Sequence, residues 1–289
     1  METQEIHRVG VVGCGLMGSG IAEVCARAGL TVSVAELDGD ALSRGRQRIE
    51  QSLKRAAKAG KITEDEALRL VEDMSFSTDL GTLADCQLVV EAVVEAEAAK
   101  VEVFRRLGEV VQAPDALLAS NTSSIPIMKL AMATNRPQRV LGLHFFNPVP
   151  VLPLVELVSS LLTSPEASDE AEDFARQVLH KHVIRSQDRA GFIVNALLIP
   201  YLLSSIRMLE SGFATAEDID EGMMKGCAHP MGPLALSDLI GLDTTMAVAN
   251  SLYEEFKEPL YAPPPLLARM VEAGLLGKKA GRGFYDYRA

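Results

Sequence analysis

Near the start of the chain a strand, a glycine turn and a helix follow one another, and this order constrains the fold more than any other stretch. Residues 9–12 read VGVV, residues 13–18 read GCGLMG, and a helix-like pattern then runs from 19 to 28. The three glycines allow a tight bend, close approach of the backbone to a pyrophosphate, and close helix–strand packing, while the helix N-terminus offers free N–H groups. We therefore expect a dinucleotide to contact Gly13, Gly15, Leu16, Met17 and Gly18.

An acid at the end of the next strand supports this interpretation. Residues 31–34 read TVSV, and Glu36 follows them, 18 residues after Gly18. A carboxylate there accepts hydrogen bonds from ribose hydroxyls and repels a 2′-phosphate, which favours NAD over NADP. The alternative is a glycine turn in an unrelated α/β protein with a solvated Glu36, but the complete strand–turn–helix–strand context disfavours it.

The later patterns predict an α/β domain followed by an all-α domain. Further strands are expected at 88–94, 117–120, 140–144, 155–158 and 183–186, and helices at 41–59, 64–73, 98–111 and 166–181, with Thr63 as an N-cap. From Phe192 onward we expect only helices, at 193–209, 216–225, 233–240, 244–255 and 265–273. The prediction is a Rossmann-type doubly wound, mostly parallel sheet over residues 1–187 and a helical substrate and dimerisation domain over 188–289. The second domain is too apolar to stand alone, so we expect a homodimer through it.

A histidine, an asparagine and an acid lie in apolar surroundings at 142–150 (GLHFFNPVP) and 154–157 (LVEL). The pKa of an unperturbed histidine lies near neutrality, so His144 is a candidate general base, and Glu156 could stabilise its protonated form. A satisfied core histidine is the ordinary interpretation of a lone His in an apolar strand. The neighbouring Asn147, the matched Glu156 and the cofactor loop favour catalysis.

Other polar groups follow strands whose carboxyl ends share one edge of a parallel sheet. Glu95 and Lys100 follow one strand, as a cofactor-binding pair or an ordinary surface pair. Residues 121–124 (NTSS) follow the next, where they could hold a substrate oxygen or merely cap a helix from Pro126. Basic residues crowd the helix at 41–59, namely Arg44, Arg46, Arg48, Lys54, Arg55 and Lys58. This segment alone favours a solvated face over a phosphate site.

Composition excludes several classes of protein. A formal net charge of −11 and a pI near 5.0 argue against nucleic-acid and anionic-membrane partners. The four cysteines show no C-x-x-C spacing, so neither a structural zinc site nor a disulfide framework is indicated, and no metal is expected. The acidic start and the absence of a membrane-length apolar run predict a cytoplasmic protein with reduced thiols.

Seven collinear motifs together resemble the L-3-hydroxyacyl-CoA dehydrogenase family, in particular its stand-alone bacterial 3-hydroxybutyryl-CoA branch. They are GCGLMG, ASNTSS at 119–124, GLHFFNPVP, LVEL, GFIVN at 191–195, HPMGPLALSDLIGLD at 229–243 and GKKAGRGFYDY at 277–287. The resemblance implies a homodimeric, NAD-dependent oxidoreductase that interconverts (S)-3-hydroxyacyl-CoA and 3-ketoacyl-CoA, with short acyl chains.

The resemblance also implies roles for residues. His144 would be the base and Glu156 its partner, with Ser123 and Asn195 holding the 3-oxygen and thioester end of the substrate. The implied NAD contacts are Glu36, Glu95, Lys100, Asn121 and Asn147. A helical hairpin inserted in the sheet domain would grip CoA through Ser52, Arg55 and Lys58, which reverses the preference for a solvated face. Two positions depart from the family pattern: Ala59 stands where relatives often have lysine, and Glu36 where they usually have aspartate.

Two other functions remain open at this point. Another two-domain β-hydroxyacid or sugar-acid dehydrogenase would share the glycine turn and helical domain, but such enzymes commonly use a lysine base. A non-catalytic dinucleotide-binding protein, comparable to lens crystallins related to dehydrogenases, would bind NAD without turnover. The His144–Glu156 pair argues against both.

Overall fold

The protein, in a computed structural model, is described over residues 5–288. The chain divides into two compact units between Asp188 and Arg189, one residue beyond the predicted boundary. Each unit has its own cluster of buried apolar side chains.

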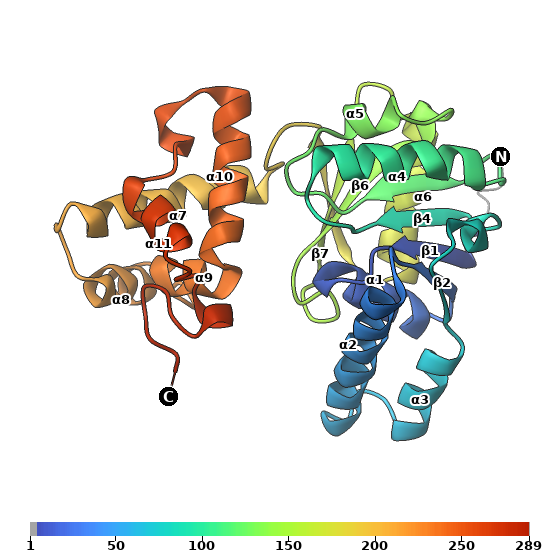
Figure 1. The fold of residues 1–289 in the computed structure, drawn as a ribbon, viewed down its shortest axis with the longest axis horizontal. Coiled ribbons are helices and arrows are strands. Elements are labelled where there is room, and N and C mark those ends of the chain that lie inside the picture. Colours follow the sequence, from blue (N-terminus) through green and yellow to red (C-terminus); the bar gives the residue numbers. More distant parts are fainter. Residues whose placement is uncertain (1–4, 289) are drawn as a thin grey trace. The chain divides into compact units, whose positions relative to one another are not determined.

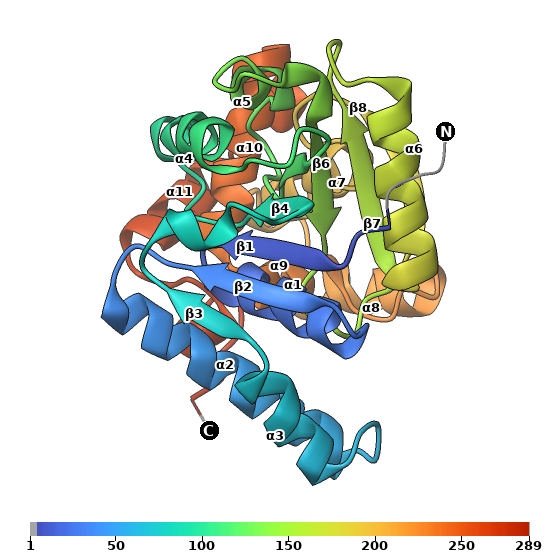
Figure 2. The ribbon, with the colours of Figure 1, turned by 90° about the vertical axis from the view of Figure 1, so that its right-hand side faces the viewer.

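The first unit is built on an eight-stranded sheet in the order β3-β2-β1-β4-β5-β6-β7-β8. The strands are β1 Arg8–Val12, β2 Thr31–Ala35, β3 Ser75–Ser77, β4 Leu88–Glu91, β5 Leu117–Ser120, β6 Val140–Phe145, β7 Leu154–Ser159 and β8 His182–Gln187. All neighbours are parallel except β6 and β7, which are antiparallel. The predicted Rossmann-type, mostly parallel sheet is confirmed (Figure 2). The short polar β3 was not predicted, and β4 ends earlier than expected.

Helices cover the faces of this sheet. They are α1 Leu16–Arg27, α2 Gly39–Lys58, α3 Glu64–Glu72, α4 Glu97–Val110, α5 Ile127–Ala131 and α6 Pro165–Asp173, and a π-helical turn extends α6 over Phe174–Val178. The predicted hairpin is α2 and α3, which extend together beyond the sheet (Figures 1 and 2). Thr63 caps α3, because its hydroxyl accepts from the Glu66 N–H while the Glu66 carboxylate accepts from the Thr63 N–H.

The central strands explain why the polar groups at their ends are unusual. Every residue of β4, β5 and β6 is buried, as expected where helices cover both faces of a parallel sheet. Glu91, Ser120 and His144 are therefore carried into the interior at or next to the strands' last residues. A buried polar side chain is costly unless it is paired, so each of these residues must be explained by its partners.

The second unit consists of helices α7 Val194–Glu210, α8 Ala216–Gly226, α9 Pro233–Ile240, α10 Leu242–Phe256 and α11 Pro265–Glu272. Two buried aspartates organise it. Asp220 accepts hydrogen bonds from the N–H groups of Leu234 and Ala235 at 2.8 and 2.9 Å and so caps α9. Asp238, fully buried, accepts from the N–H groups of Phe284 and Tyr285 at 3.0 Å and ties the segment after α11 to this core.

Candidate active site

The glycine turn between β1 and α1 forms an open cradle. Gly13 has a φ of +88°, which favours glycine. A Cβ at Gly18 would lie 1.8 Å from the carbonyl oxygen of Gly13, so the helix packs too closely for any side chain there. In the part of the chain that the structure describes, a Cβ at Gly15 would meet nothing within 4 Å, and no side chain caps the N-terminus of α1. These residues fit a dinucleotide pyrophosphate, whose oxygens would accept the N–H groups at the start of α1.

Glu36 lies beside this turn. Its Oε1 accepts from the N–H of Cys14 at 2.6 Å, and its Oε2 accepts from the N–H of Leu37 at 2.9 Å. Burial and then the nearby charge of Glu36 raise the pKa of the Cys14 thiol to about 12, so this thiol stays protonated. The two hydrogen bonds from the N–H groups of Cys14 and Leu37 hold the Glu36 carboxylate at the turn, where the predicted ribose contact needs it.

His144 and Glu156 form a buried pair. They are register partners on β6 and β7, and His144 Nδ1 lies 2.7 Å from Glu156 Oε2. The Glu156 side chain is fully buried and that of His144 is 8% exposed. An ionised carboxylate only accepts hydrogen bonds, so it selects the imidazole tautomer with the proton on Nδ1 and makes Nε2 the basic nitrogen. This is the geometry of a general base with its orienting acid.

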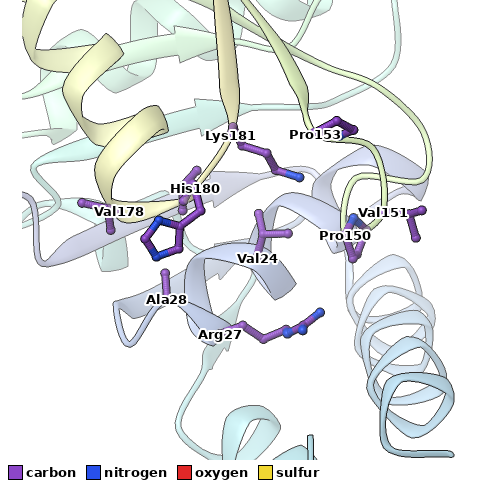
Figure 3. Close-up of a pocket in the computed structure, with 10 residues that line it drawn as sticks. Val24, Arg27, Ala28, Pro150, Val151, Pro153, Val178, His180 and Lys181 are labelled. Carbon is purple, nitrogen blue, oxygen red and sulfur yellow. The ribbon is translucent and has the colours of Figure 1, made fainter. Parts of the chain in front are cut away.

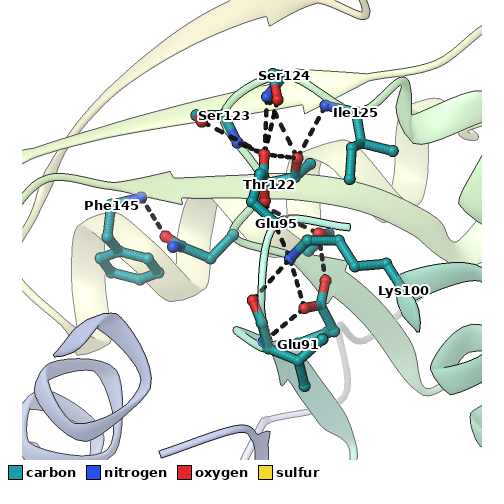
Figure 4. A network of polar contacts seen from close by, with 11 residues as sticks. Glu91, Glu95, Lys100, Thr122, Ser123, Ser124, Ile125 and Phe145 are labelled. Carbon is teal, nitrogen blue, oxygen red and sulfur yellow. Dashed lines mark hydrogen bonds and ion pairs between the residues drawn. The ribbon is translucent and has the colours of Figure 1, made fainter. Parts of the chain in front are cut away.

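A network of charged groups links the ends of β4 and β5 to the start of α4 (Figure 4). The Lys100 ammonium is 1% exposed and donates to Glu91 Oε1 at 2.6 Å, while Glu95 Oε2 lies 3.3 Å away. The alternative of an ordinary surface pair for Glu95 and Lys100 is therefore wrong. Burial alone would raise the pKa of Glu95, but the charge of Lys100 and hydrogen bonds from residues 122–124 outweigh it and lower this pKa.

Ser123 belongs to this network, and Asn121 lies beside it. Glu95 Oε1 accepts from the N–H of Ser123 at 2.9 Å and lies 3.4 Å from its hydroxyl. Asn121 Oδ1 accepts from the N–H of Phe145 at 2.9 Å, so its carbonyl joins the exit of β5 to the residue after His144. The structure thus brings together predicted substrate and cofactor residues from two strands.

The alternative that residues 121–124 cap the following helix is wrong. The N–H groups of Ile127 and Met128, at the start of α5, donate to the two carboxylate oxygens of Asp188 at 2.7 Å. This cap joins residues that are about 60 positions apart, so no local pattern could have indicated it.

A cavity of about 250 Å³ lies between α1, α2 and residues 147–150. Its lining includes two predicted cofactor residues, Leu16 and Asn147, and two predicted CoA residues, Ser52 and Arg55. Lys58 is exposed and does not line the cavity. Four of the predicted contacts thus converge on one hollow in the first unit.

Sequence reasoning missed Glu23, which also lines this cavity. It is 1% exposed, and Arg27 lies 3.5 Å away. Within residues 5–288, neither of its carboxylate oxygens has a hydrogen-bond partner in good geometry. Burial raises its pKa, while nearby Ser52 and Arg27 oppose that effect. Leu16, Ser19, Gly20 and Glu23 line the cavity at i, i+3, i+4 and i+7 of α1, and this spacing could have indicated Glu23 as inward-facing.

A larger cavity of about 500 Å³ lies elsewhere in the first unit (Figure 3). Arg27, His180 and Lys181 are among the residues lining it, and none of the predicted site residues is. The Lys181 ammonium donates to the carbonyl oxygens of Val149 and Leu152 at 2.6 and 2.8 Å, so it braces the backbone. Size alone therefore does not identify the candidate active site.

Asn195 belongs to the second unit, where it is half-buried in the first turn of α7. Among residues 5–288, no group of three or more His, Cys, Asp or Glu side chains is arranged to hold a metal ion. Within the same range, no helix combines the length and the apolar character needed to cross a membrane.

Known proteins resemble the chain over nearly its whole length. A family model described as "3-hydroxyacyl-CoA dehydrogenase, NAD binding domain" matches residues 8–189, and one described as "3-hydroxyacyl-CoA dehydrogenase, C-terminal domain" matches residues 191–287. A 3-hydroxybutyryl-CoA dehydrogenase of Mycobacterium tuberculosis is 64% identical over 282 residues, covering 98% of this chain and 99% of the relative.

Solved structures agree with this match. The crystal structure of M. tuberculosis FadB2 is 63% identical, with a TM-score of 0.97 over 98% of this chain and 100% of that one. The (S)-3-hydroxybutyryl-CoA dehydrogenase PaaH1 of Ralstonia eutropha is 43% identical, with a TM-score of 0.92 over 98% and 99% of the two chains. The glycine cradle, the His144–Glu156 pair and these matches together show that the chain belongs to the 3-hydroxyacyl-CoA dehydrogenase family.

Proposed function

We propose that this protein catalyses the reversible, NAD-dependent oxidation of (S)-3-hydroxyacyl-CoA to 3-ketoacyl-CoA, with the short 3-hydroxybutyryl-CoA and acetoacetyl-CoA as its pair. The observation that carries the proposal is the buried His144–Glu156 pair at 2.7 Å, in the same domain as a glycine cradle that fits a dinucleotide. The relatives in M. tuberculosis and R. eutropha are named as 3-hydroxybutyryl-CoA dehydrogenases, which supports 3-hydroxybutyryl-CoA as a substrate.

His144 moves the proton in this mechanism. When NAD is bound it supplies the acceptor for the hydride that leaves C3 of the substrate. As C3 becomes a carbonyl, His144 Nε2 takes the proton of the 3-hydroxyl, and Glu156 stabilises the imidazolium through Nδ1. In the reverse direction the protonated His144 returns the proton to the 3-oxygen. Ser123, and Asn195 from the second unit, would hold this oxygen and the thioester end in line.

The remaining predicted residues bind the two ligands. For NAD we infer contacts from Gly13, Gly15, Leu16, Met17, Gly18, Glu36, Glu95, Lys100, Asn121 and Asn147. The Glu36 carboxylate at the turn favours NAD over NADP, because it would repel a 2′-phosphate. For CoA we infer Ser52, Arg55 and Lys58 on α2, where the cations would form charge-assisted hydrogen bonds with phosphate oxygens.

A homodimer in the cytoplasm completes the proposal. In the second unit, several large apolar side chains are exposed, among them Leu197 at 73% and Phe213 at 79%. Burial of such a surface against a second copy is the usual way to remove it from water. A light-scattering mass equal to the 31.1 kDa chain at micromolar concentration would contradict the dimer.

The experiment that tests the function is oxidation of NADH by the purified protein with acetoacetyl-CoA, followed at 340 nm. NADPH, free acetoacetate and a longer 3-ketoacyl-CoA serve as comparison substrates. We expect fast turnover with NADH and acetoacetyl-CoA and slow turnover with NADPH. Reduction of the free acid but not of the CoA ester would instead favour the other β-hydroxyacid dehydrogenases, and NADH binding without turnover would favour a non-catalytic protein.

A further inference from the structure

The hydroxyl of Thr122 uses all of its hydrogen-bonding capacity inside the turn that carries Ser123. Thr122 is fully buried, and its hydroxyl donates to Glu95 Oε1 at 2.6 Å. It accepts from the N–H groups of Ile125 and Ser124 at 2.9 and 3.3 Å. One donor and two lone pairs are the full inventory of a threonine hydroxyl, so Thr122 has no group left for a ligand.

The backbone of Thr122 is held from the other side. Its N–H donates to the hydroxyl of Ser120 at 3.1 Å, and that hydroxyl donates to Glu91 Oε2 at 2.6 Å. Glu91 is fully buried and pairs with Lys100, whose ammonium also faces Glu95. The contacts therefore close a ring, which runs through Thr122, Glu95, Lys100, Glu91 and Ser120 and back to Thr122 (Figure 4).

The contribution of this ring to the free energy of folding does not by itself explain its presence. Its Glu91–Lys100 pair is buried, and replacing such a buried ion pair by apolar side chains is often neutral or stabilising. What the ring does achieve is a rigid turn, because Glu95 Oε1 also accepts the N–H of Ser123 at 2.9 Å. Ser123 is the proposed hydroxyl for the 3-oxygen of the substrate.

We propose that Thr122 and Glu91 are positioning residues for the reaction. Through the closed ring they hold the Ser123 hydroxyl where it can form a hydrogen bond with the 3-oxygen of the substrate. Both side chains are fully buried, so their role is exerted through Ser123 and not through a ligand contact of their own. This inference rests on the proposed function, because it assigns a purpose to Ser123. A catalytic group displaced by about 1 Å can cost about 100-fold in rate, so loosening the turn reduces turnover more than binding.

The test compares Thr122→Val with Thr122→Ser. Valine keeps the shape of threonine but removes the hydroxyl, whereas serine keeps the hydroxyl and loses a methyl. For Thr122→Val we expect kcat with acetoacetyl-CoA to fall at least about tenfold, with the KM for acetoacetyl-CoA and the Kd for NADH within about threefold of wild type. For Thr122→Ser we expect kcat within about threefold of wild type. Equal losses in the two variants, or a normal kcat in Thr122→Val, would overturn the inference.

Two further variants guard the test. Thr163→Val removes another partly buried hydroxyl, one that donates to the carbonyl of Val140 at 2.7 Å, at the end of β6 away from His144, and we expect a lower Tm with normal kcat. If Thr122→Val does not fold, Glu91→Gln removes a charge from the ring and should give the same split between kcat and KM. Unchanged kcat in a folded Glu91→Gln would count against the inference. The wild-type rate decides the proposed function separately, since only the ratio of variant to wild type bears on the ring.

Discussion

His144 and Glu156 are direct register partners on β6 and β7, the antiparallel pair of neighbouring strands in a sheet whose other neighbours are parallel. The carboxylate therefore reaches Nδ1 of the imidazole without a loop or a flexible arm between them. Both side chains are shielded from water, which strengthens their electrostatic coupling.

Glu156→Gln should show whether the charge of Glu156, and not only its shape, is needed to orient His144. The amide preserves the shape of Glu156 but can donate to Nδ1, which selects the wrong tautomer and removes the charge that stabilises the imidazolium. We expect kcat to fall by about 100-fold or more with little change in the Kd for NADH. Steady-state rates and NADH fluorescence titration measure the two quantities. His144→Gln should lose at least as much, and near-normal turnover by a folded His144→Gln would refute the assignment of the base.

Gly15→Ala and Gly18→Ala should fail in different ways. A Cβ at Gly15 meets no atom of residues 5–288 within 4 Å, so the variant should fold normally. It should bind NADH about tenfold more weakly, since the methyl enters the space of the pyrophosphate. At Gly18 the Cβ would collide with the Gly13 carbonyl, and we expect a loss of stability. Gly222→Ala, on α8 and also open, is the control and should leave NADH binding unchanged. Wild-type affinity in Gly15→Ala would place the cofactor elsewhere.

Glu23 should make stability fall as pH rises. Burial raises its pKa in the folded state above the ordinary value of 4.5, so between these two values the folded protein holds a proton that the unfolded chain has lost. The free energy of unfolding therefore decreases as pH increases through this window. Glu23→Gln cannot titrate, so its stability relative to wild type should improve as pH rises from 4.5 through the raised pKa of Glu23 in the folded protein. Urea denaturation across this range gives the comparison, and parallel pH curves would show that Glu23 does not titrate there.

Asp238 should anchor the segment after α11. Its carboxylate accepts from two backbone N–H groups at 3.0 Å and from the hydroxyl of Tyr287 at 3.1 Å. Asp238→Ala leaves these donors without their partner in a buried site, and we expect a cost of about 2–5 kcal/mol in the free energy of unfolding. Asp286→Ala, which removes an exposed ion pair of the same segment, should cost much less than Asp238→Ala. Similar losses in both variants would mean that Asp238 is not the anchor.

The sequence predicts an element correctly where a local pattern of residues determines it. Strand β5 and helix α9 lie where periodicity placed them, and the glycine turn is explained residue by residue through its contacts. The edge strand β3 was missed because Ser75–Ser77 is only three residues long, with Phe76 as its one apolar residue, and it is ordered by pairing with β2. Short strands at an edge depend on their neighbour more than on their own residues.

The site was predictable in its parts but not in its connections. His144, Glu156 and Ser123 could be selected as chemical groups from their surroundings in the sequence. The ring through Thr122 and Glu91 could not, because its contact between Ser120 and Glu91 joins residues 29 positions apart and depends on strand register. Glu23 differs from the ring, because its spacing from Leu16, Ser19 and Gly20 on α1 was available in the sequence and was overlooked.

Because β6 and β7 pair directly, the catalytic pair depends on which face of β7 carries Glu156. Side chains alternate between the two faces of a strand, so Val155 and Leu157 point to the side opposite Glu156. A one-residue slip of β7 would bring an apolar side chain to the imidazole and send the carboxylate to the other face. A change in the length of the connection at 146–153 is therefore compatible with catalysis only if β7 keeps the register that pairs Glu156 with His144.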